Sequence, residues 1–502
     1  MKKIMENREI KCGIILSYIE QVITILSGLI YTPIMLRLLG KSEYGLYQLA
    51  YSIISFLGLL NFGFASGYLR LYFRYKKNED KVGIESLNGM YLLIFLLVSV
   101  LAIISGIVII ASCGEIFDTG LSLREIERIK TLIFIMILSL VITFMTSVFD
   151  CYLTAYNKFI FQRMVMLLKS LLNPFICLPL LFMGYKSEAL ALVSLLLSVS
   201  GFIISIYYCL KKLDMKFKFK TIDLNVFKEL FSFTFFIFLS SIVDKINLSL
   251  DNFLLGRYSG TVIVATYGVG AQINVFYNKI STSISSIFAP KINAILVKDN
   301  CQNEILELFI KISKPLFLIL ISVWSGFLFF GKIFITIWAG KQYIDSYYVA
   351  LILMLSCIIP LTQVCGIEIQ KAKNMHKMRS VIYFFAALVN VIISIPLIKK
   401  YGAIGASIGT LITMIISNCI FMNFYYHKIV KLDMIIYWKE IIPLIRFLIA
   451  SIIIGIIYLL FSSKSLIESI VYGGIYILCI FCSIMIEYHS SEKKEKIFEK
   501  RN

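Results

Sequence analysis

Three ionisable residues lie in the middle of one apolar stretch, where lipid would disfavour them. Asp244, Lys245 and Asp251 occur among Phe, Ile and Leu residues of one predicted helix. At about 100° per residue, they share one side of that helix with Asn247 and Asn252. Each charge facing hydrocarbon would cost roughly 2.5–3.5 kcal/mol, so these side chains must face partners or a water-filled cavity.

Two interpretations of this polar side remain open. In the first, it is a structural network in which a carboxylate neutralises Lys245. In the second, it lines a transport cavity: Asp244 or Asp251 couples transport to an ion, and Lys245 and Asn247 contact a substrate. The sequence alone supports both.

The first predicted helix carries a similar polar stripe. Ser17, Glu20, Thr24, Ser27 and Tyr31 recur at helical spacing along one narrow line. The carboxyl group of Glu20 is either a hydrogen-bond partner between helices or a second candidate for ion coupling.

The predicted helix that follows the one with Asp244 is also polar on one face. That face contains Asn274, Asn278, Ser281 and Ser285. Asn274, Asn278 and the nearby Lys279 are candidate substrate contacts. Lys279 and Lys169 are alternatively placed to extend their ammonium groups toward the membrane surface.

No pattern of a known enzyme accompanies these groups. The chain has no Gly-rich phosphate loop, no HExxH sequence and no nucleophile elbow, and its three histidines are His376, His427 and His489. The eleven cysteines are scattered through apolar stretches without metal-ligand spacing. We therefore expect a transporter, with no catalytic residue and no metal site.

The elements that carry these residues are membrane spans. Hydrophobic residues make up 59% of the chain and charged residues 16%, well below the roughly 25% of soluble domains. Apolar runs of roughly 20 residues, long enough to cross a bilayer, recur from end to end. Because backbone groups in lipid must be satisfied locally, we expect an all-α polytopic protein with about 14 transmembrane helices.

Lysine and arginine predict the orientation. They are concentrated at the N-terminus, in the second, sixth and tenth loops and in the C-terminal tail, and they are sparser or balanced by acids in the loops between. The positive-inside rule then places both termini in the cytoplasm of a bacterial cell. The net charge of +19 is explained by this topology and needs no nucleic-acid partner.

The chain also contains an internal repeat. An offset of 217 residues aligns Asn173 with Asn390 and Pro179 with Pro396. The offset covers six predicted helices, an even number, so both halves have the same orientation. We expect two parallel six-helix bundles related by a pseudo-two-fold axis along the membrane normal, plus two extra C-terminal helices.

These patterns predict four parts of the chain. They are an N-terminal bundle at 1–210, a basic cytoplasmic linker at 211–229, a C-terminal bundle at 230–430, and two further helices with a basic tail at 431–502.

Short motifs resemble one family. The segment from Tyr31 through Pro33 and Arg37 to Gly40, followed by Tyr44-Gly45, resembles the first helix and loop of polysaccharide exporters. Further similarity occurs at Asn61-Phe-Gly63 and Ala155-Tyr-Asn157. The family is the Wzx-type flippases of lipid-linked oligosaccharides, in a superfamily that also contains multidrug extruders and the lipid II flippase.

The resemblance implies a substrate and a mechanism. The substrate would be a polyprenyl-pyrophosphate-linked oligosaccharide, moved from the inner to the outer leaflet of the cytoplasmic membrane for O-antigen, capsule or teichuronic-type assembly. Alternating access driven by a proton or sodium gradient would move it, without a cofactor. The polymerase and chain-length proteins of the same pathway are candidate partners, beside the lipid bilayer.

Cationic side chains suit the pyrophosphate of such a substrate. The candidates are Arg37, Arg70, Arg74, Lys169, Lys245 and Lys279. Three alternatives are weighed against this function. A non-transporting membrane scaffold would have no reason to retain the polar stripes. A cation-coupled multidrug exporter would have an acidic or apolar cavity, and an integral-membrane polysaccharide polymerase would have a large exterior loop, which this chain lacks.

Overall fold

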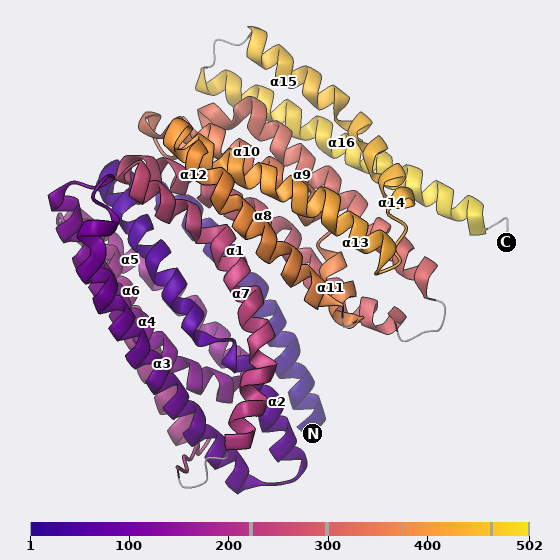
Figure 1. Ribbon diagram of the computed structural model, residues 1–502. Helices are drawn as coiled ribbons and strands as arrows, with labels where there is room; N and C mark the ends of the chain where they lie inside the picture. Colours follow the sequence, from indigo (N-terminus) through magenta and orange to yellow (C-terminus); the bar gives the residue numbers. More distant parts are fainter. Residues whose placement is uncertain (1, 220–223, 297–300, 374, 462–464, 500–502) are drawn as a thin grey trace. The chain divides into compact units, whose positions relative to one another are not determined.

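Helices make up nearly all of the regular structure that the computed structural model describes (Figure 1). The description covers residues 2–219, 224–296, 301–373, 375–461 and 465–499, without the side chains of residues 2–15, Tyr18 and Ala450 and of parts of α7, α8, α12 and α16. Described residues include no strand. The expected all-α fold is therefore confirmed.

Two compact units divide the chain, Met1–Ala265 and Thr266–Asn502, here called unit 1 and unit 2. The helices of unit 1 are α1 (Lys2–Leu57), α2 (Phe64–Lys77), α3 (Lys81–Ile116), α4 (Leu123–Ala155), α5 (Phe159–Phe182), α6 (Ser187–Tyr207), the short helix η2 (Tyr208–Lys212), α7 (Leu224–Tyr258) and the start of α8 (Thr261–Leu296). The boundary between the units thus falls inside α8, and α7 packs on α1 and α2 of unit 1. This grouping differs from the four parts expected from the repeat, which stay a prediction.

Unit 2 contains the rest of α8 and the C-terminal helices. These are α9 (Gln302–Trp338), α10 (Ser346–Thr362), α11 (Cys365–Ala372), α12 (His376–Met414), η4 (Ile415–Met422), α13 (Asn423–Lys428), α14 (Met434–Ile441), η5 (Ile442–Leu448), α15 (Ile449–Phe461) and α16 (Leu466–Glu499). The last helices pack on α9, where the hydroxyls of Ser325 and Tyr476 lie 2.6 Å apart.

Two of the longest helices are each broken by a glycine. The 56-residue α1 would extend about 84 Å if straight, far more than the roughly 30 Å of a bilayer core. Its backbone turns at Gly40 (φ 75°), and α12 turns at Gly402 (φ 56°). Both φ values lie in the left-handed region that glycine tolerates best, so each long helix comprises two separate segments.

Length and composition identify membrane spans. Within the described residues, seven helical stretches are long and apolar enough to cross a membrane, or up to nine if each bent pair counts as one span. Two of the seven have 59 and 51 residues and contain the breaks at Gly40 and Gly402. Each is therefore long enough for two crossings, so the structure is roughly consistent with the expected 14 spans.

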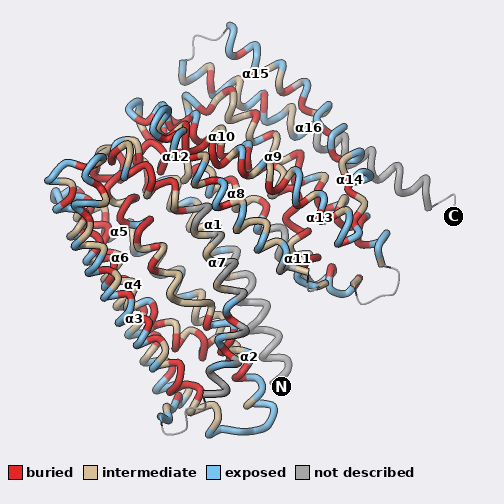
Figure 2. The backbone as a smooth tube through the Cα atoms, viewed as in Figure 1, coloured by how far each residue is buried: buried red, intermediate tan, exposed pale blue. Residues whose placement is uncertain are grey.

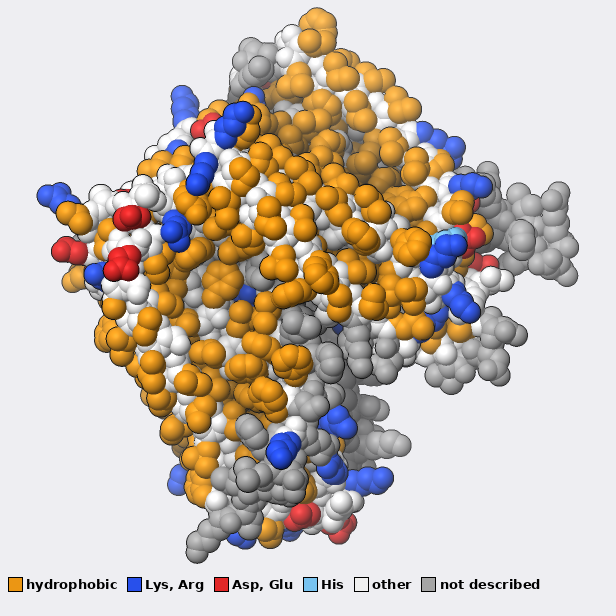
Figure 3. Space-filling model, viewed as in Figure 1, with side chains coloured by type: hydrophobic (Ala, Val, Ile, Leu, Met, Phe, Trp, Pro, Cys, Tyr) orange, Lys and Arg blue, Asp and Glu red, His pale blue; other side chains and the backbone are white. Residues whose placement is uncertain are grey.

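The surface has the character expected in lipid. Large apolar side chains such as Phe175 (73% exposed) and Phe182 (70%) point outward from the helices. Exposed residues follow the outer sides of α3 to α6 in Figure 2, and hydrophobic atoms cover much of the same region in Figure 3. Lysine, arginine and acidic side chains in that region gather at the ends of the helices. A multi-pass membrane protein presents this pattern.

Turns in unit 1 alternate between its two ends. The turns after Gly40, before α4, between α5 and α6, and between α7 and α8 are joined by polar contacts, so they share one end. The basic α2 region and the segment after α6 share the other, since Tyr68 and the carbonyl of Lys216 both bond Asn88. Helices that cross a membrane alternately up and down require this arrangement.

Candidate functional site

Helix α5 carries an arginine that is paired inside unit 1. The Arg163 Nη1 donates to Glu20 Oε2 of α1 at 3.1 Å, with side chains 39% and 22% exposed. Two turns further along, the hydroxyls of Thr24 and Ser170 lie 3.2 Å apart. The polar stripe predicted on the first helix thus faces α5 at Glu20 and Thr24.

A lysine on another side of α5 faces α6. Lys169 lies ten residues after the start of α5, about 15 Å along its axis, and is half-buried. Its terminal Cε and Nζ occupy the position that a Cβ atom on Gly201 of α6 would take. Lys169 also interacts electrostatically with Asp150 near the end of α4. The side chain therefore leans toward the end of α5 where the helix starts, as helical side chains do.

Sequence reasoning missed Arg163 and Asp150. Both lie within about five residues of a helix end, and from the sequence alone a charged residue at such a position is assigned to the neighbouring loop. Asp150 nevertheless directly follows the long, uncharged and mostly apolar stretch of α4. An acidic residue in that position was the one sequence feature that could have identified it as a candidate. Together with Glu20 and Lys169 they form two pairs of opposite charge flanking α5, which we call the α5 pairs.

The structure describes α7 only in part. Lys245 is half-buried, whereas Asp251 and Asn252 are buried at 3% and 8% exposure. Ser249, on the same helix, accepts a hydrogen bond of 2.7 Å from Ser55 of α1. The side chains of Asp244 and Asn247 lie outside the described residues, so their roles remain predictions, as do those of Lys245 and Asp251.

Two of the α8 candidates meet in unit 2. The amide groups of Asn274 and Asn278 both point at the thiol of Cys357 on α10, with N–S distances of 3.7 and 4.0 Å. Among the described residues, the buried Oδ1 of Asn274 has no hydrogen-bond partner. An acceptor in this position suits a hydroxyl donor. Lys279 is half-buried one residue beyond Asn278.

Three arginine candidates lie on the surface. Arg37 on α1 and Arg70 and Arg74 on α2 are all exposed. Arg70 and Arg74 share the end of unit 1 that contains the segment after α6.

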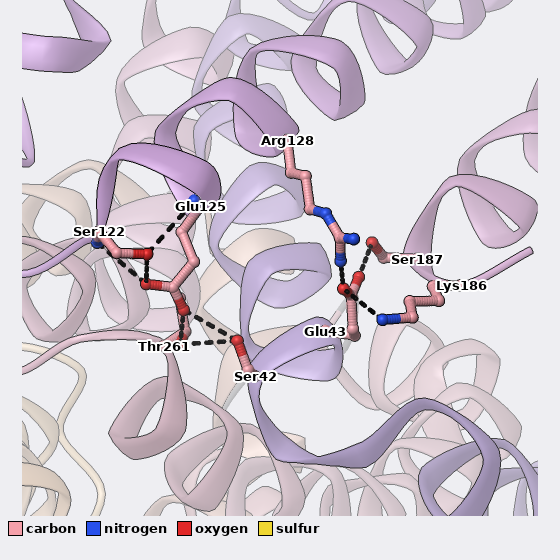
Figure 4. Close-up of polar contacts among 8 residues, drawn as sticks. All are labelled: Ser42, Glu43, Ser122, Glu125, Arg128, Lys186, Ser187 and Thr261. Carbon is pink, nitrogen blue, oxygen red and sulfur yellow. Dashed lines mark hydrogen bonds and ion pairs between the residues drawn. The ribbon is translucent and has the colours of Figure 1, made fainter.

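Eight residues at the opposite end form a polar network, which we call the turn cluster. They form two neighbouring groups of contacts: Ser42, Ser122, Glu125 and Thr261 in one, and Glu43, Arg128, Lys186 and Ser187 in the other (Figure 4). Arg128 pairs with Glu43, Lys186 lies 3.7 Å from it, and the Ser187 hydroxyl donates to it at 2.7 Å. Glu43 is only 6% exposed, so its charge is neutralised by these donors rather than by water.

Glu125 organises the other half of the turn cluster. Its Oε1 accepts from the hydroxyls of Thr261 at 2.6 Å and Ser42 at 2.8 Å. Its Oε2 accepts from the backbone N–H of Ser122 at 3.0 Å, which completes a capping box at the start of α4. One carboxylate therefore joins the first turn, the start of α4 and the α7–α8 turn (Figure 4).

Close backbone packing accompanies this junction. A Cβ atom at Gly45 would collide with the carbonyl of Thr261. The Thr119 hydroxyl donates 2.6 Å to the carbonyl of Arg257, and the rings of Phe117 and Phe253 are 5.6 Å apart. This end of α7 is thus held tightly on α1 and on the turn before α4.

These features define a class of protein. Long apolar helices crossing alternately, with charged pairs inside the spans, are typical of multi-pass membrane transporters. The pattern of the polysaccharide biosynthesis protein family matches residues 10–293, more than half of the chain. The chain belongs to that family, and the resemblance to Wzx-type exporters is confirmed at the family level.

One curated relative is a Shigella flexneri protein named for O-antigen transport. The two are 22% identical over 398 residues, covering 78% of this chain and 91% of the relative.

Solved structures share the fold. A lipid II flippase, MurJ, in an inward closed conformation has a TM-score of 0.72 at 18% identity, covering 95% of this chain and 99% of that one. An inward-facing multidrug resistance transporter of the MATE family, in the MOP superfamily, has a TM-score of 0.68 at 15% identity, with 82% and 95% covered. These likenesses concern the fold alone.

Proposed function

We propose that this protein moves a lipid-linked oligosaccharide, carried on a polyprenyl pyrophosphate, from the inner to the outer leaflet of the bacterial cytoplasmic membrane. Family membership and the relative named for O-antigen transport support a substrate of surface-polysaccharide assembly. The observation that carries the proposal is the cation of Lys169, half-buried at mid-span in a chain of this family.

Chemistry at α5 suits such a substrate. A pyrophosphate is anionic and binds lysine and arginine. Arg163 is ion-paired with Glu20, and Lys169 is half-buried within the electrostatic reach of Asp150. An arriving pyrophosphate would compete with those carboxylates for the cations. Hydroxyl groups such as those of Ser170 and Thr24 would contact the sugars.

The orientation and the energy source belong to the same proposal. The end with α2 and the basic segment after α6 faces the cytoplasm, and the turn cluster faces outward, as the positive-inside rule requires. A proton or sodium gradient drives alternating access. The carboxylates of Glu20, Asp244 and Asp251, named from the sequence, are joined as coupling candidates by Asp150.

Reconstituted vesicles test this function directly. A fluorescent polyprenyl-pyrophosphate oligosaccharide is placed in one leaflet, and its transfer is followed with wild type, Lys169→Ala and the matched control Lys400→Ala, an exposed lysine at the end of a helical segment. We expect wild-type transfer, about a tenfold or larger loss in Lys169→Ala, and a normal rate in Lys400→Ala.

The same vesicles separate the alternatives. Lys245→Ala and Asp251→Asn test the predicted polar side of α7 in parallel. If wild type transfers no lipid under any proton or sodium gradient but expels organic cations, the chain is a drug exporter and the proposal fails.

A further inference from the structure

The segment after α6 is docked on unit 1 by backbone and side-chain contacts. Met215 is 4% exposed, and its N–H donates to the carbonyl of Cys209 at 3.0 Å. Two residues on, the ring of Phe217 packs 6.4 Å from that of Phe149 on α4. Met215 and Phe217 therefore anchor residues 213–219, here called the docked linker, which begin with a left-handed turn at Asp214 (φ 49°).

Its backbone is bound specifically by α3. The Asn88 amide donates to the carbonyl of Lys216 at 2.9 Å and accepts 2.7 Å from the Tyr68 hydroxyl. The Lys218 N–H donates to the carbonyl of Glu85 at 3.0 Å. A Cβ atom at Gly89 would collide with the Lys218 carbonyl, so α3 leaves room for the linker at that position.

This register turns the basic side chains outward. Lys216 and Lys218 are exposed, and Phe219, next to them, is 50% exposed. Asp214 lies 3.2 Å from Lys216, but both are well exposed, so this pair neutralises little of the charge. Lys211 and Lys212, just before the docked linker, are exposed as well.

Membrane topology alone does not explain why the basic linker has a defined conformation. The positive-inside rule depends on the number of lysines and arginines in a loop, and a flexible loop satisfies it equally well. Here a buried Asn–Tyr pair and a glycine instead hold two lysines on one side at a spacing of roughly 7 Å. Lysines on one side of a segment and an exposed Phe on the other are the combination found in segments that lie at the membrane–water interface.

We propose that the docked linker is a binding surface for anionic phospholipid headgroups of the inner leaflet. Lys216 and Lys218 contact headgroup phosphates, while Phe219 enters the border of the acyl chains. The inference takes its leaflet from the orientation in the proposed function. Its chemistry, binding of phosphate by fixed lysines, does not depend on the transported substrate.

Native mass spectrometry of the purified full chain tests the binding. Wild type, the double variant Lys216→Gln/Lys218→Gln and a control Lys399→Gln/Lys400→Gln are titrated with phosphatidylglycerol and with phosphatidylcholine. Near a surface each lysine contributes about a factor of five in binding, so the linker variant should lose phosphatidylglycerol adducts about tenfold or more. The control, which also removes two exposed lysines, should stay near wild type.

A third variant separates geometry from charge. Gly89→Val keeps every lysine but displaces the Lys218 backbone. We expect it to lose phosphatidylglycerol adducts as the double variant does. Unchanged binding in folded Gly89→Val would show that only total charge matters and would overturn the proposal.

Two other outcomes would also overturn it. An equal loss of phosphatidylglycerol adducts in the Lys399→Gln/Lys400→Gln control would mean that any two exposed lysines bind the headgroups equally well. Retention of phosphatidylglycerol with selective loss of a polyprenyl-pyrophosphate lipid would assign the docked linker to substrate capture instead. Because adduct formation is measured without transport, a failure here is distinct from a failure of the flippase assignment in vesicles.

Discussion

At the scale of single residues, Lys169 illustrates how a cation is positioned inside a membrane protein. The terminal atoms of Lys169 lie in the space left by the missing side chain of Gly201, which gives the charge a preferred position. Asp150 supplies a counter-charge from a third helix. This placement makes the position of Lys169 testable without changing the lysine itself.

We predict that Gly201→Val impairs transport while leaving stability nearly unchanged. The valine displaces only the flexible end of Lys169, which can swing aside at small cost. Lipid transfer should fall about tenfold, with the apparent Tm in detergent within a few degrees of wild type. Gly114→Val is the matched control, since a Cβ there meets nothing within 4 Å. Normal transfer by Gly201→Val would show that the lysine needs no fixed position.

A second prediction concerns the Glu20–Arg163 pair. Both side chains are partly exposed, so their attraction should add only about 0.2–1 kcal/mol to stability. A double-mutant cycle with Glu20→Gln and Arg163→Gln, measured by denaturation in detergent, gives this coupling energy. A coupling above about 2 kcal/mol would mean that the pair serves the fold rather than the substrate.

At the scale of elements, the turn cluster acts on the α7–α8 turn. Glu125 connects Thr261 to Ser42 and to the start of α4. In a transporter that alternates its access, the outer ends of helices must separate once per cycle. The Glu125 half of the turn cluster, like the Ser55–Ser249 hydrogen bond, is among the contacts that would have to break for α7 to leave α1.

We therefore predict that locking this junction stops transport. The Ser42 and Thr261 side-chain oxygens lie 3.4 Å apart, close enough for cysteines at both positions to be oxidised to a disulfide. Oxidation of Ser42→Cys/Thr261→Cys should abolish lipid transfer, and a reductant should restore it. The single variants Ser42→Cys and Thr261→Cys, oxidised in the same way, should transfer lipid normally. Full transfer by the cross-linked protein would mean that this junction stays closed throughout the cycle.

Some elements could be predicted from the sequence and others could not. Apolar length predicts the helices, and the Leu-Leu-Gly40 motif lies at the turn that breaks α1. The stripe with Glu20 and Thr24 was predicted, but its partners Arg163 and Ser170 were not, because helical periodicity specifies a face and not its neighbour. The packing of α7 within unit 1 depends on long-range contacts such as Ser55–Ser249, which no local pattern encodes.

At the scale of the whole molecule, coupling to an ion gradient is the property that remains to be tested. Glu20 is ion-paired with Arg163, and Asp150 is within the electrostatic reach of Lys169; an anionic substrate would attract both cations. When the substrate takes the cation, the carboxylate loses its counter-charge and gains affinity for a proton or sodium ion.

This argument predicts that Asp150→Asn uncouples transport. Downhill exchange of labelled lipid between leaflets should persist, whereas the stimulation by an imposed proton or sodium gradient should disappear. The measurement compares initial rates with and without the gradient, and with an ionophore that collapses it. Asp214→Asn, which removes a well-exposed carboxylate, is the control and should respond to the gradient as wild type does. Gradient stimulation that survives in Asp150→Asn would exclude this carboxylate from coupling.

The docked linker also limits how far the chain can move. Phe219 follows a backbone fixed to α3, and α7 begins at Leu224, five peptide steps later. Five residues reach at most about 18 Å even when fully stretched. As long as the linker stays docked, the start of α7 therefore remains within that distance of the linker's binding site on α3. The Tyr258 end of α7, at the turn cluster, can therefore move further than the Leu224 end. The helix would rotate about a point near Leu224.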